Sequence, residues 1–87
     1  MNEPDPTEIT EAIRDILKEH GRLSRDVDAL GVDADLNQAG MTSHASVNIM
    51  LAIEGRFDLE FPDHMLTRSV FSSIGSMRAA VIQLLSG

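Results

Sequence analysis

The sequence predicts an all-α fold: a four-helix up-down bundle with three main helices, one short helix and a long first loop. Two observations lead to this prediction. Apolar residues recur every three or four positions in three separate segments, which is the spacing of an amphipathic helix. The alternation that indicates a strand occurs over residues 58–62, and that run is too short for a sheet of its own. We expect an extended connector there.

The first helix is expected over residues 6–20. Asp5 is a suitable capping residue, Pro6 fits the first helical position, and Glu8 lies three residues after the cap. Gly21 ends the pattern. The apolar stripe of this helix consists of Ile9, Ala12, Ile13, Ile16 and Leu17.

Residues 21–42 form a long connection, which is uncommon in a compact domain and is often functional. We expect this loop to act as the crossover of the bundle, with one short helical turn over residues 33–37. Apolar side chains should pin the loop to the core, namely Leu23, Val27, Leu30, Val32 and Leu36.

The second helix should span about residues 43–56, and its broad apolar face is typical of a central helix. A short helix capped by Asp63 is expected over 63–69, and Ser72 or Ser73 should open the last helix. On the second helix, one apolar flank comprises Val47, Met50 and Leu51, and the adjoining flank comprises Ile49, Ile53 and Phe57. The core stripe of the last helix comprises Ile74, Met77, Val81, Leu84 and Leu85.

Length and composition indicate one domain over residues 1–87, with its core at about 6–85. The chain has no cysteine, which excludes disulfides and thiolate metal sites, and its three histidines are too dispersed to suggest a metal site. No apolar run reaches transmembrane length, and the N-terminus lacks the pattern of a secretory leader. We therefore expect a cytoplasmic monomer that contacts no membrane.

The net charge of −7 makes nucleic acid an improbable partner, because phosphate contacts need lysine and arginine. A basic enzyme surface is the more natural partner. The charge is uneven: residues 1–35 hold ten acidic and four basic side chains, and residues 36–87 hold four acidic and three basic ones.

Ser43 is the main candidate for chemistry, since it lies after Gly40 and directly ahead of the second helix. A hydroxyl at a helix N-terminus is well placed to carry a phosphate. The same position also suits a plain helix cap, and the local pattern leaves both interpretations open. Ser46 lies inside the helix without a preceding glycine turn. A hydrolase built on Ser43 and His44 is disfavoured, because adjacent helical residues point about 100° apart.

Three motifs in order resemble the acyl carrier protein family over about residues 7–85. The first is Gly-Met-Thr-Ser-His at 40–44, the second contains Glu54, Phe57, Leu59, Phe61 and Pro62, and the third contains Phe71, Ser73 and Ile74. The resemblance implies that Ser43 carries 4′-phosphopantetheine, added by a phosphopantetheinyl transferase. It also implies a carrier without catalysis of its own, whose arm holds cargo as a thioester for partner enzymes. The alternative is an unmodified helical interaction module with Ser43 only as a cap.

Two residues depart from the usual pattern of the family and point to one group within it: Thr42 replaces the usual aspartate and His44 replaces the usual leucine. The run from Gly40 to Asn48 is similar to a specialised bacterial group of aminoacyl carriers. Members of that group are loaded by an amino acid:carrier protein ligase resembling a truncated seryl-tRNA synthetase. The resemblance therefore implies such a ligase as a partner, together with a downstream enzyme that accepts the cargo. A carrier for an unusual acyl chain is the other option. The expected partner surface comprises Met41, Thr42, His44, Val47, Asn48 and, secondarily, Arg56.

Four methionines have two interpretations. They fill the core, or they line an adaptable interior that sequesters an acyl chain. The residues are Met41, Met50, Met65 and Met77.

Overall fold

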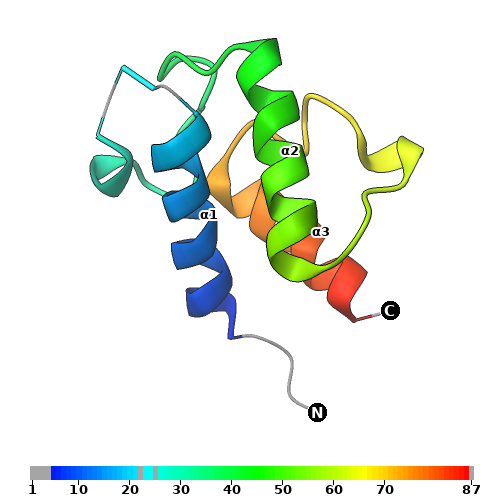
Figure 1. The fold of residues 1–87 in the computed structure, drawn as a ribbon. Helices are drawn as coiled ribbons and strands as arrows, with labels where there is room; N and C mark the ends of the chain where they lie inside the picture. The colour runs from blue at the N-terminus through cyan, green and yellow to red at the C-terminus, as the bar shows by residue number, and fades with distance from the viewer. Residues whose placement is uncertain (1–4, 22, 25, 87) are drawn as a thin grey trace.

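The computed structural model describes residues 5–21, 23–24 and 26–86 of the chain. Within these residues all regular secondary structure is helical, with three α-helices, two 3-10 turns and no strand. The order is α1 (Pro6–His20), η1 (Val27–Ala29), α2 (Ser43–Phe57), η2 (Asp63–Met65) and α3 (Ile74–Leu85), as Figure 1 shows. The predicted all-α class, with three main helices and a long first loop, is confirmed.

Helix α1 begins and ends where the sequence predicts. The Asp5 carboxylate accepts the Thr7 amide at 3.0 Å, and Pro6 occupies the first helical position. At the other end the Gly21 amide donates to the Leu17 carbonyl at 2.8 Å. The buried stripe is the predicted one and packs against both α2 and α3, so α1 is the helix that holds the other two together.

Helices α2 and α3 both run antiparallel to α1 in Figure 1. Hydrogen bonds tie the start of α3 to the first loop, from Leu36 N–H to Ser72 O and from Gly75 N–H to Val32 O, each 2.8 Å. The crossover is therefore made by residues 58–73, which return from the end of α2 to the start of α3. The prediction that the first loop makes the crossover is wrong, because that loop joins neighbouring ends of α1 and α2.

The first loop is anchored by burial and by hydrogen bonds. Val27, Leu30 and Leu36 are buried, and the other two predicted anchors are partly buried. The Arg14 guanidinium donates through Nη1 to the carbonyls of Val27 at 2.7 Å and Leu30 at 2.8 Å. The helical turn expected over 33–37 is replaced by a single hydrogen-bonded turn that lies slightly later, in which the Ala39 amide donates to the Asp35 carbonyl at 3.2 Å. The 3-10 turn lies earlier, at η1, and the Asp35 carboxylate instead supports a turn by accepting the Asn37 amide.

The short helix expected over residues 63–69 is only the 3-10 turn η2. Pro62 takes the cap position without a side-chain hydrogen bond, so Asp63 is not the cap. Residues 66–69 are exposed, which leaves a longer helix without an apolar face to bury. The segment is anchored on both sides, because the rings of Phe61 and Phe71 pack edge to face at 5.4 Å.

Helix α3 starts with a capping box between Ser73 and Ser76, which decides between the two predicted caps. The largest fully buried side chains come from all three helices and the first loop, namely Ile9, Ile13, Leu17, Leu36, Ile49, Ile53, Ile74, Met77 and Val81. No polar side chain in the described part of the chain is buried. None of the helices found there has the length and apolar character needed to cross a membrane.

Candidate functional site

The start of α2 is capped by Thr42 and not by Ser43. Thr42 has extended backbone angles, and its Oγ1 accepts the Ala45 amide at 3.1 Å. Gly40 prepares this geometry with a φ of 106°, and a side chain there would come within 3.2 Å of Ser24. Few residues other than glycine adopt this backbone conformation. The turn at Gly40 and the Thr42 cap together fix where the helix begins.

Ser43 is the first residue of the helix, and its side chain is exposed. Within the described residues, no hydrogen bond involves its hydroxyl. The backbone amides of Ser43 and His44 also have no acceptor there, as expected for the first residues of a helix. An exposed hydroxyl beside unbonded amides is available for modification. This geometry contradicts the alternative in which Ser43 serves only as a helix cap.

Ser46 differs from Ser43 in both exposure and bonding. Its side chain is half-buried, and its hydroxyl donates to the Thr42 carbonyl at 3.2 Å. Because this hydroxyl already has a partner and lies inside the helix, it is the poorer acceptor for a modifying enzyme.

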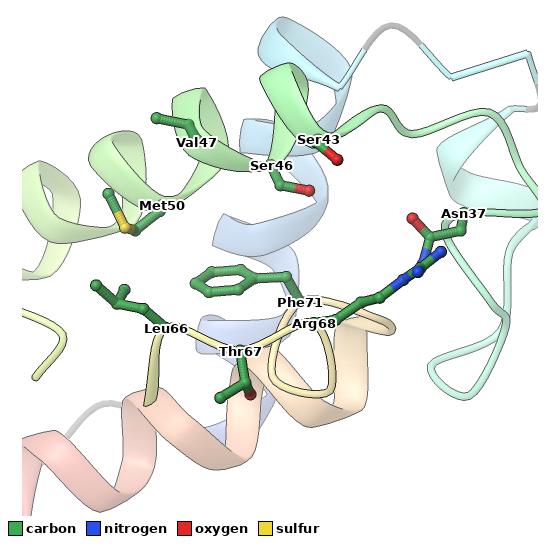
Figure 2. A pocket seen from close by; sticks show the side chains of 9 residues that line it. All are labelled: Asn37, Ser43, Ser46, Val47, Met50, Leu66, Thr67, Arg68 and Phe71. Carbon is green, nitrogen blue, oxygen red and sulfur yellow. The ribbon is translucent and has the colours of Figure 1, made fainter. Parts of the chain in front are cut away.

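An open groove of about 490 Å³ runs from Ser43 along one flank of α2 (Figure 2). Its walls come from α2, from the connection that precedes α3 and, at one end, from Asn37 of the first loop. The lining residues are Asn37, Ser43, Ser46, Val47, Met50, Leu66, Thr67, Arg68 and Phe71. Apolar side chains line the part farther along α2, and polar side chains surround the end next to Ser43.

His44 and Asn48 lie on the other flank of α2. Both are exposed, and they line a second depression of about 360 Å³ between α2 and the end of α1. His20 lines the same depression and lies 3.6 Å from a carboxylate oxygen of Glu19. The predicted contact residues of α2 therefore surround Ser43 on two sides. Within the described chain, no three histidine or acidic residues form a group that could hold a metal.

Two predicted surface residues do not join this cluster. Met41 is only 5% exposed and belongs to the core, where its amide bonds the Leu36 carbonyl, so its assignment to the contact face is wrong. Arg56 is exposed but lies 13 residues after Ser43, roughly 20 Å along the helix and about 140° around it. Thr42 is exposed beside Ser43, with its hydroxyl oxygen engaged in the cap.

The sequence analysis expected Val47 on the partner surface, and it missed that Leu51 and Leu66 are exposed apolar side chains as well. Val47, Leu51 and Leu66 are 52%, 55% and 44% exposed, and Val47 and Leu51 lie on the apolar flank of α2 that the sequence predicts. A spacing of four residues puts Val47 and Leu51 on one face of the helix. Pattern alone could have flagged them, because the apolar face of α2 is wider than a small bundle can cover. We call Val47, Leu51 and Leu66 the exposed apolar patch.

Helix α2 carries little charge for a docking surface. It contains Glu54 and Arg56 as its charged residues, and its first turn contains no acid. The Glu54 carboxylate accepts the Phe61 amide at 2.9 Å and so fixes the connector after the helix. A partner that binds here therefore meets mainly apolar and neutral polar side chains.

The family model described as "Phosphopantetheine attachment site" matches residues 7–81 of the chain. An aminoacyl carrier protein of Agrobacterium fabrum is 47% identical over 75 residues, which cover 86% of this chain and 90% of that protein. A chain in the crystal structure of an engineered Bradyrhizobium japonicum glycine:[carrier protein] ligase complexed with carrier protein from Agrobacterium tumefaciens and ATP also matches. It has a TM-score of 0.84 and 43% identity, covering 87% of this chain and 99% of that one.

A second ligase structure is also similar. It is the crystal structure of Bradyrhizobium japonicum glycine:[carrier protein] ligase complexed with glycylated carrier protein, in which a chain matches with a TM-score of 0.65 and 29% identity, covering 86% of this chain and 96% of that one. The family match spans most of the chain and includes the start of α2, and the fold agrees with that of these carrier structures. The chain therefore belongs to the phosphopantetheine-attachment family and is a phosphopantetheine-dependent carrier protein.

Proposed function

We propose that Ser43 is the attachment residue and that the chain carries a small amino acid, such as glycine, for partner enzymes. The observation behind this proposal is the exposed, unbonded hydroxyl at the first position of α2, with the cap supplied by Thr42. A prosthetic group there extends into solvent or into the adjoining groove without displacing any packed side chain. When bound, phosphopantetheine supplies a terminal thiol that holds an acyl group as a thioester.

The fit of a phosphopantetheine to this place follows from the chemistry of its surroundings. The first turn of α2 has no acidic residue to repel a phosphodiester, and its N-terminal amides are partial positive charges. The groove beside Ser43 combines polar side chains near the hydroxyl with apolar ones farther away.

An aminoacyl cargo is supported by the relatives and by the core. The curated relative is an aminoacyl carrier, and the similar structures are complexes with glycine:[carrier protein] ligases. Three of the four methionines discussed above, Met41, Met65 and Met77, are buried in the core, and Met50 lines the groove. This placement favours the core-filling interpretation. An open groove suits a short cargo, because a long alkyl chain needs an enclosed apolar cavity.

We propose that the partner enzyme supplies the catalysis. Ser43 and His44 are neighbours on one helix, and no carboxylate in the described chain is bonded to the His44 imidazole. A nucleophilic serine needs a base within hydrogen-bond reach and an orienting third group. The expected partners are a phosphopantetheinyl transferase, a loading ligase and a downstream acceptor enzyme.

The first test is the intact mass of the protein after co-expression with a broad-specificity phosphopantetheinyl transferase. The wild-type chain and Ser46→Ala should gain one phosphopantetheine, and Ser43→Ala should gain none. A mass gain on Ser43→Ala would show that phosphopantetheine is attached to a residue other than Ser43. No gain on the wild-type chain, under conditions that modify a known carrier, would overturn the proposal.

The second test addresses the cargo and the contact face. The modified protein is incubated with a glycine:[carrier protein] ligase, ATP and single amino acids, and thioester formation is followed by mass. We expect glycine or another small amino acid to be loaded. The double variant His44→Leu, Asn48→Glu should load more slowly, and unchanged kinetics would remove these two residues from the contact face.

A further inference from the structure

We propose that Arg68, assisted by Asn37, binds the phosphodiester of the arm on Ser43 while the carrier is free of partners. This inference rests on the attachment to Ser43 proposed above. It assigns a binding role to a residue of the connection between α2 and α3, outside the three sequence motifs.

Placement is the first argument. Arg68 lines the groove that begins at Ser43, and Asn37 lines it from the first loop. Figure 2 shows the Arg68 side chain reaching along the groove toward Asn37, with the Ser43 hydroxyl at the same polar end. The three side chains come from α2, the first loop and the later connection. A group attached to Ser43 is thus flanked by both other residues.

Charge is the second argument. Among the arginine and lysine side chains that the structure describes, Arg68 alone lines this groove. The others are engaged or distant: Arg14 bonds two carbonyls, Lys18 pairs with Asp28 at 2.8 Å, and Arg78 bonds the Thr10 hydroxyl.

Arg68 itself makes no ion pair and no hydrogen bond within the described residues. An exposed guanidinium without a partner, on a chain of net charge −7, is well suited to receive an anion. A phosphodiester presents two oxygens that match the fork of its N–H donors.

Hydrogen bonding is the third argument. Asn37 is half-buried, its backbone amide is already held by the Asp35 carboxylate at 2.9 Å, and its side chain faces the groove. The Asn37 side chain therefore sits on a fixed backbone and can donate its amide N–H to a phosphate oxygen. Because the Asp35 carboxylate bonds the backbone amide of Asn37, the test also asks whether Arg68 responds to this carboxylate in place of the phosphodiester.

The test compares apo and modified forms of wild type, Arg68→Gln and Arg56→Gln, with modification verified by intact mass. Arg56→Gln is the matched control, because it removes the same charge from an exposed arginine at the far end of α2. The readouts are the ³¹P signal of the phosphodiester, the ¹⁵Nε signal of Arg68 and the melting temperature of each form.

We expect modification to move the Arg68 Nε signal and to raise the wild-type melting temperature by about 2–6 °C. Arg68→Gln should shift the ³¹P signal and abolish the rise, and Arg56→Gln should do neither. The rise should shrink in about 1 M salt, where the Debye length is about 3 Å.

Three outcomes would overturn the proposal. Complete modification with an unmoved Arg68 signal and the same ³¹P shift in Arg68→Gln would refute the role of Arg68 and leave the carrier function intact. An Arg68 signal that responds to Asp35→Asn in the apo protein, and not to modification, would assign Arg68 to Asp35. Absence of any mass gain would refute the attachment itself and this inference with it.

Discussion

The structure separates the helix cap from the proposed attachment residue, and measurements of stability can test this separation. Thr42 Oγ1 accepts the Ala45 amide, whereas the Ser43 hydroxyl has no bond within the described chain. Loss of a capping side chain costs about 1 kcal/mol, within a range of about 0.5–2. For a domain of this size that corresponds to a fall in melting temperature of about 4–8 °C. We therefore expect Thr42→Ala to lower the melting temperature of the apo protein by this amount.

Ser43→Ala should change the unfolding free energy by less than about 0.5 kcal/mol, since an exposed, unbonded side chain is replaced by the best helix former. Thr42→Ser keeps the capping oxygen and should stay close to wild type. Urea and thermal unfolding of the three apo variants measure these differences. Equal destabilisation by Ser43→Ala and Thr42→Ala would refute the reasoning, because it would show that Ser43 contributes to the cap in solution.

Three further predictions concern the loop anchor, the exposed apolar patch and one ion pair. Arg14→Met should destabilise by about 1–3 kcal/mol in urea unfolding, because it leaves two part-buried carbonyls without their donor; a loss under about 0.5 would contradict the anchor. Val47→Ser with Leu51→Ser should leave the melting temperature close to that of wild type but slow ligase loading at least about fivefold, which corresponds to a loss of about 1 kcal/mol of interface energy; normal loading would place the contact elsewhere. The hydrogen bond from Lys18 to Asp28, more than the charge of Asp28, raises the pKa of Lys18 above 10.5. The ion pair therefore stabilises the fold below pH 10.5, and this stabilisation is lost as the pH rises through the folded-state pKa of Lys18. Titration of the Lys18 amine by NMR in wild type and Asp28→Asn checks this, and equal values would show that the pair does not form.

Helix positions were predictable because their signals are local. Asp5, Pro6 and Gly21 bracket α1 in sequence, and the same residues bracket it in the structure. Ser43 also stood out from its local position, but its neighbours left both a cap and an attachment site open, and the family resemblance favoured attachment. Local signals could not give the direction of α3 or the length of the short helix, because both depend on contacts between distant segments.

The exposed apolar patch shows why the face of α2 was harder to predict. The helix is apolar on several sides, so its periodicity does not say which side meets α1. The structure buries Ala45, Ile49 and Ile53 against the core and leaves Val47 and Leu51 in solvent. Apolar area left exposed on a small domain is typical of a binding surface, since its burial against a partner is favourable. The exposed apolar residues of α2 are therefore the side chains to test for contact with a partner.

If Ser43 is the attachment residue, as proposed above, the threonine that precedes it in place of the family's aspartate has a physical explanation. An aspartate caps a helix as well as threonine does, but it places a negative charge beside the phosphodiester. Thr42 supplies the capping oxygen without that charge, and the first turn of α2 contains no acid. With Arg68 across the groove, the surroundings of Ser43 favour an anion more than an aspartate would allow. Thr42→Asp should therefore preserve the stability of the apo protein. The modified form of this variant should melt at a lower temperature than its apo form.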